Sequence, residues 1–74
     1  MDQHDFERDP AAVLRRAAES ADATGDTLNA ELARLWRAVA ADLQRGAHAP
    51  PMNARILLGA VRSARAFLGL PPQQ

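Results

Sequence analysis

Residues 27–45 read TLNAELARLWRAVAADLQR, and large apolar residues recur in this stretch at steps of three and four. At about 100° of rotation per residue they fall within an arc of roughly 100°, which predicts one amphipathic helix with a single apolar stripe. The stripe consists of Leu28, Leu32, Leu35, Trp36, Val39 and Leu43. Trp36 is the only tryptophan, and its place at the edge of the stripe favours packing in the core over contact with a partner.

A shorter helix is predicted over residues 10–23. Asp9 is expected to be its N-cap, because the carboxylate can accept hydrogen bonds from the first amide groups, and Pro10 suits the first helical position. The side that we expect to point inward is mostly alanine: Val13, Leu14, Ala17, Ala18 and Ala21. Small side chains let a neighbouring helix approach closely but bury little area, so this helix should be the weakest taken alone.

Glycines separate these helices from each other and from a third. Gly25 can adopt the left-handed conformation that ends a helix, after which Asp26 or Thr27 is expected to cap the next one. Gly46 ends the second helix, and a pair of prolines precedes a third helix predicted over residues 51–68.

The third helix combines a wide apolar side with a strong stop signal. Its apolar residues cover roughly 140° of the helical projection: Ile56, Leu57, Ala60, Val61, Ala64, Phe67 and Leu68. Gly69 is expected to be a left-handed cap, with Leu70 folding back onto the helix. Gly59 lies inside the helix, and we expect it to mark the close approach of another helix.

These elements predict an all-α protein, a small three-helix antiparallel bundle that dimerisation could complete. The second and third helices should form the main hairpin, with the first packed across them. Residues 9–70 would form the domain, residues 1–8 an acidic arm and residues 71–74 a short tail. A chain of 74 residues buries a modest core, so we expect a homodimer or a complex with another chain.

The net charge is zero, but the charges are unevenly distributed. Residues 1–31 carry eight acidic side chains against three arginines, and residues 32–74 carry one acidic side chain against six arginines. One interpretation is that these halves attract each other, within one chain or across a dimer. The other is that either half binds a partner of opposite charge. All nine basic residues are arginine and alanine is abundant, which suggests a GC-rich and hence bacterial genome.

The sequence offers little for catalysis. Cysteine is absent, which excludes disulfides and thiolate metal sites, and the two histidines lie in segments predicted to be irregular. Ser20 and Ser63 fall on predicted helices with no histidine nearby in sequence. We therefore expect no enzyme, no cofactor and no metal. The polar start of the chain and its short apolar runs predict a cytoplasmic protein without a membrane segment.

One apolar residue stands out on the polar side of the third helix. Leu58 projects about 60° beyond the apolar arc, among Arg55, Arg62 and Arg65. Arginine around an apolar side chain is typical of contact surfaces, although a single exposed leucine is also common on ordinary surfaces. We take these four residues as the candidate partner-binding site.

The function that follows is a non-enzymatic helical protein-interaction module, a small adaptor or regulator that uses the third helix, homodimerisation or both. The partner would be a second copy or another protein. One alternative is a nucleic-acid-binding regulator that uses the same arginines with Arg34 and Arg37, although the neutral charge and the acidic arm oppose it. A second is a small acidic inhibitor, similar to an antitoxin, that covers a basic surface of its partner.

Overall fold

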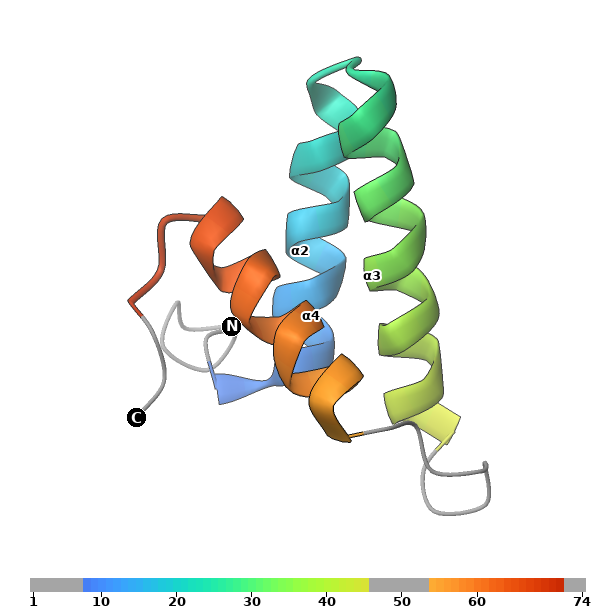
Figure 1. Ribbon diagram of the computed structural model, residues 1–74, viewed down its shortest axis with the longest axis vertical. Helices are drawn as coiled ribbons and strands as arrows, with labels where there is room; N and C mark the ends of the chain where they lie inside the picture. The colour runs from blue at the N-terminus through green and yellow to red at the C-terminus, as the bar shows by residue number, and fades with distance from the viewer. Residues whose placement is uncertain (1–7, 46–53, 72–74) are drawn as a thin grey trace.

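The computed structural model describes residues 8–45 and 54–71 of the chain. It contains α2 (Pro10–Ala23), α3 (Thr27–Arg45) and α4 (Ala54–Phe67), and the described residues form no strand. The predicted all-α three-helix bundle is thereby confirmed (Figure 1). The prediction that the third helix starts at residue 51 or 52 falls outside the described residues, and so does nearly all of the acidic arm.

The predicted signals fix both ends of α2. The Asp9 carboxylate accepts a hydrogen bond from the Ala11 amide at 3.1 Å, and Pro10 is the first helical residue. At the other end the Gly25 amide donates to the Asp22 carbonyl at 3.2 Å, and Gly25 has a φ of 72°. Asp26 then caps α3 by accepting from the Leu28 amide at 3.4 Å.

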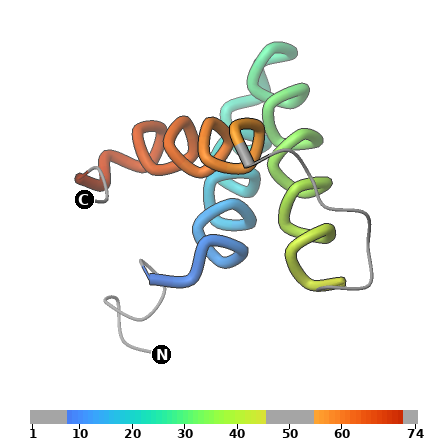
Figure 2. Tube along the Cα trace, turned by 60° about the horizontal axis from the view of Figure 1, so that its bottom comes forward, coloured from blue at the N-terminus to red at the C-terminus, as the bar shows by residue number. Residues whose placement is uncertain are grey.

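The main hairpin joins α2 to α3, not α3 to the third helix. Figures 1 and 2 show α2 and α3 side by side and antiparallel, with α4 lying across them, and α3 touches α2 far more than it touches α4. The expectation that the first helix packs across the other two was wrong. Its physical reason is the alanine side of α2, where Ala17, Ala18 and Ala21 are fully buried and let α3 and α4 approach closely.

Only part of the predicted stripe on α3 reaches the core. Trp36 and Val39 are each 1% exposed and Leu43 packs against the core, as predicted. Leu28 is 69% exposed, Leu35 47% and Leu32 37%, so the expected burial of these three was wrong. The helix is rotated so that small residues as well as Trp36 face inward, because α2 lies beside it: the buried small residues of α3 are Ala33 and Ala40.

Helix α4 ends in the predicted glycine cap. The Leu70 amide donates to the Arg65 carbonyl at 2.9 Å and the Gly69 amide to the Ala66 carbonyl at 3.1 Å, with a φ of 74° at Gly69. This is the Schellman arrangement, in which the residue after the glycine folds back, and Leu70 accordingly packs against the core. The helix itself ends at Phe67, one residue before the predicted end.

Gly59 does not mark a close approach of helices. It is exposed, and a Cβ atom placed on it would meet no atom within 4 Å. The expectation of a neighbouring helix at this position was wrong, because α4 turns a different side, with Ala60 and Ala64, toward the core.

The two glycines of the α4 region should therefore respond to alanine in opposite directions. Gly69→Ala forces a side chain into the left-handed region and should lower the free energy of unfolding by about 1–2 kcal/mol. For a domain of this size, each kcal/mol lowers the melting temperature by roughly 4–8 °C. Gly59→Ala should raise stability by about 0.5–1 kcal/mol, since the helix gains propensity and no atom is displaced. Thermal melts followed by circular dichroism test both, and equal shifts of one sign would contradict this account.

Candidate protein-interaction surfaces

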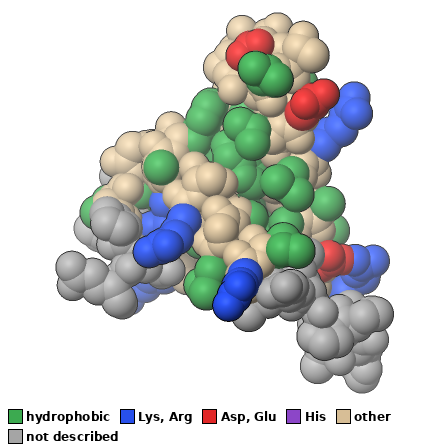
Figure 3. Space-filling view, in the orientation of Figure 1, with side chains coloured by type: hydrophobic (Ala, Val, Ile, Leu, Met, Phe, Trp, Pro, Cys, Tyr) green, Lys and Arg blue, Asp and Glu red, His purple; other side chains and the backbone are tan. Residues whose placement is uncertain are grey.

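The predicted contact residues on α4 are only partly brought together. Leu58 is 63% exposed, and Arg55 and Arg62 are exposed as expected. Figure 3 shows basic side chains on either side of a hydrophobic one along this part of the surface. We call Arg55, Leu58 and Arg62 the α4 outer group.

Arg65 is not part of that surface. Its side chain is buried, with 6% exposed, and its Nε and Nη2 donate to the Pro71 carbonyl at 3.0 and 2.7 Å. The expected outward position was wrong because the chain turns back after Gly69 and brings a backbone acceptor over this side of the helix. Arg65 thus holds the end of the fold together.

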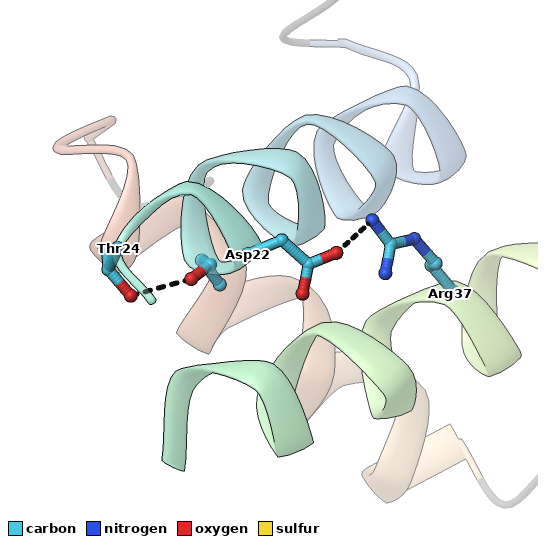
Figure 4. A network of polar contacts seen from close by, with 4 residues as sticks. Asp22, Thr24 and Arg37 are labelled. Carbon is cyan, nitrogen blue, oxygen red and sulfur yellow. Dashed lines mark hydrogen bonds and ion pairs between the residues drawn. The ribbon is translucent and has the colours of Figure 1, made fainter. Parts of the chain in front are cut away.

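The arginines proposed for nucleic acid are also partly engaged within the protein. Figure 4 shows Asp22 of α2 and Arg37 of α3 reaching toward each other, and their ion pair measures 2.5 Å. Arg45 pairs with Asp42 one turn earlier on the same helix, while Arg34 is exposed. The Asp22–Arg37 pair joins the acidic and basic halves of the chain, as predicted for attraction within one molecule. It also reduces the positive charge that α3 presents to a phosphate backbone.

A shallow hollow lies between α2 and α3 near this ion pair. It measures about 190 Å³, and its lining residues are Arg15, Glu19, Arg37, Ala40, Ala41 and Gln44. Ligand pockets usually measure about 300–1,000 Å³, so this hollow is smaller than a usual ligand pocket.

Within residues 8–45 and 54–71, no three histidine or acidic side chains come together as metal ligands. No helix in these residues has the length and hydropathy to cross a bilayer.

An exposed apolar surface on α3 and α4 was missed by sequence reasoning. Among the described residues, six large apolar side chains are exposed. By helical spacing, five of them lie on the sides of α3 and α4 that border the Trp36–Phe67 contact. We call these five the leucine face: Leu28, Leu32 and Leu35 of α3, with Ile56 and Phe67 of α4. Figure 3 shows hydrophobic side chains following one another over the upper part of the hairpin toward α4.

Trp36 connects the two helices beneath this face. Its ring meets that of Phe67 edge-on, with centroids 5.4 Å apart and planes at 61°. Its indole Nε1–H donates to Ser63 Oγ at 3.2 Å, and that hydroxyl donates to the Ala60 carbonyl at 3.0 Å. Residues 56, 63 and 67 lie on one side of α4 by helical spacing, so this side borders the exposed leucines of α3.

The sequence did contain a signal for this surface. The α3 stripe extends over 16 residues, whereas a crossing helix can cover only two or three turns of its neighbour. The side chains of the stripe beyond the crossing therefore stay exposed to solvent unless a further element covers them.

No family model, curated protein or solved structure matches this chain. The fold and surfaces described above define a small all-α protein with an exposed apolar face.

Proposed function

We propose that this protein is a non-enzymatic interaction module, a small adaptor or regulator that binds another protein chain. One observation carries the proposal: the leucine face exposes five large apolar side chains, each 37–69% accessible, on a chain of 74 residues. Isolated exposed apolar residues are ordinary, but contiguous ones mark contact sites on soluble proteins. Burying them on a partner would release the water that now covers them.

The leucine face is the primary contact surface in this proposal. Its side chains are aliphatic and aromatic, and Phe67 is anchored on the buried Trp36 ring, so part of the surface is held in place before binding. A preorganised surface loses less side-chain entropy on association. The α4 outer group, centred on Leu58, is the second contact surface, and its arginines suit a polar rim.

Crosslinking inside the cell tests this proposal. A photo-reactive residue, Leu35→p-benzoylphenylalanine, places the probe in the leucine face, and Leu58→p-benzoylphenylalanine places it in the α4 outer group. Gln44→p-benzoylphenylalanine is the matched control, because Gln44 is exposed on the polar side of α3. We expect a protein adduct at position 35, a weaker one at position 58 and none at position 44.

The same experiment separates the competing functions. An adduct that nuclease digestion removes would support nucleic-acid binding instead. Reversible binding of the purified protein to DNA should then weaken steeply with salt, since phosphate contacts release counterions. Equal labelling at positions 35 and 44, or none at 35 and 58, would contradict the proposed surfaces.

A further inference from the structure

We infer that the leucine face is covered by a second copy of this chain, in a symmetric dimer whose α3 helices run antiparallel. The inference rests on the proposed function and names its partner. In such a dimer Leu32 and Leu35 of each protomer lie close to the two-fold axis, and Leu28 and Phe67 lie toward the edges.

Helices α3 and α4 differ in length. The 19 residues of α3 span about 28 Å and the 14 residues of α4 about 21 Å. Because α4 also lies across the hairpin, the N-terminal half of α3 extends beyond it (Figures 1 and 2). Leu28, Leu32, Leu35 and Val39 follow one another at steps of four, three and four, the spacing of helix-pairing seams. Val39, at the end of that seam, is buried within the protomer. The side chains at the first three positions are exposed and accessible to a partner helix.

The exposed apolar area of the leucine face is comparable with that of one side of a stable interface. A stable interface buries about 800 Å² on each partner, of which roughly 450 Å² is apolar. Five large side chains at 37–69% exposure supply apolar surface of that order from each protomer. A symmetric dimer uses the same patch twice, so one exposed face satisfies both sides of the interface.

The charges along α3 favour one orientation of the paired helices. Glu31 and Arg34 are both exposed and lie on the same flank of α3, about 70° and about 130° from the centre of the seam, so the long Arg34 side chain reaches back toward the interface. Antiparallel pairing about the Leu32–Leu35 region sets Glu31 of one protomer toward Arg34 of the partner subunit, twice. A parallel arrangement would place the flank that carries Glu31 and Arg34 on opposite sides of the two-fold axis in the two protomers, so these charges would not meet. Charges of opposite sign on the two sides of the midpoint therefore select the antiparallel dimer.

Light scattering over a dilution series, with single substitutions, tests this inference. The chain has a mass of 8.0 kDa, and we expect twice that mass, falling toward the monomer on dilution. Leu35→Glu should raise the dimer dissociation constant by at least about tenfold, since it buries a charge in the interface. Leu58→Glu is the matched control: Leu58 is 63% exposed, against 47% for Leu35, but lies outside the leucine face, so the dimer should persist. Both positions are exposed in the protomer, and unchanged helical circular dichroism verifies that each variant folds.

A charge exchange tests the orientation. Glu31→Arg or Arg34→Glu alone should weaken the dimer several-fold at low salt, roughly three- to tenfold from two lost pairs. The double variant, with both changes, should restore it. Failure of the double variant to recover would overturn the antiparallel arrangement.

The outcomes also separate this inference from the proposed function. A wild-type chain that stays at 8.0 kDa, while position 35 crosslinks to a different protein in cells, overturns self-association and leaves an interaction module. A monomer without any crosslink overturns both. Equal loss of the dimer by Leu35→Glu and Leu58→Glu would overturn the assignment to the leucine face.

Discussion

Trp36→Ala is expected to unfold the domain. The side chain is 1% exposed, is the largest fully buried one among the described residues and links α3 to α4. Replacing a buried tryptophan by alanine costs about 3–5 kcal/mol, and a core of this size rarely supplies more than about 3–5 kcal/mol in total. The variant should therefore lose its helical circular dichroism, or melt below room temperature, at protein concentrations where the wild type is folded.

Two smaller substitutions show which contacts of Trp36 account for the loss of stability. Trp36→Phe keeps an aromatic ring against Phe67 but removes the indole donor, and Ser63→Ala removes the acceptor and leaves the indole N–H unpaired. Ser63→Ala should cost about 1 kcal/mol, and Trp36→Phe should fall between this value and that of Trp36→Ala. Urea titrations at one fixed protein concentration measure all three, since self-association couples stability to concentration. A folded Trp36→Ala variant with a normal midpoint would show that α4 is held in place by other contacts.

Helix limits could be predicted from this sequence because the signals for them are local. Asp9 caps α2 through an amide two residues away, and Gly25 and Gly69 adopt the positive φ values that end helices. Each of these interactions spans only a few residues. A cap or a left-handed glycine therefore does not depend on which helices later pack together.

The choice of packing partners could not be predicted in the same way. Periodicity shows that Leu28, Leu32 and Leu35 share one side of α3, but not which neighbour covers that side. The alanines of α2 decided this, because a flat alanine surface admits two helices closely and places α4 across the hairpin. Sequence reasoning read the same alanines as a weakness and so assigned the main hairpin to the wrong pair of helices.

Arg65 shows a similar limit within the candidate site. On a helical projection it lies beside Leu58, and a projection ignores the chain that follows the helix. The turn at Gly69 brings the Pro71 carbonyl back over α4, where the guanidinium donates two hydrogen bonds to it. The Gly69-Leu70-Pro71 signal was recognised as a stop, but its consequence for a side chain one turn earlier depends on three-dimensional geometry.

Ala18→Leu is expected to be the second most disruptive change. Ala18 is fully buried in α2, and buried alanines recur seven residues apart on both helices of the hairpin, at Ala11 and Ala18 of α2 and at Ala33 and Ala40 of α3. This repetition keeps the two helices close along their length, and a leucine inserted there must push them apart. Overpacking of this kind costs about 1–3 kcal/mol, which lowers the melting temperature of a small domain by roughly 4–8 °C for each kcal/mol.

Ala41→Leu is the matched control, because Ala41 is exposed and lines the shallow hollow between α2 and α3, where a larger side chain has room. It should shift the free energy of unfolding by no more than about 0.5 kcal/mol, since alanine and leucine are both strong helix formers and nothing there is displaced. Hydrophobicity alone would make the buried leucine the better of the two, because it removes more apolar surface from water. If Ala18→Leu proves as stable as Ala41→Leu, the hairpin has room to adjust, and close alanine packing is not what pairs α2 with α3. A large difference would show that the smallest side chains of the core, rather than its leucines, determine which helices pair.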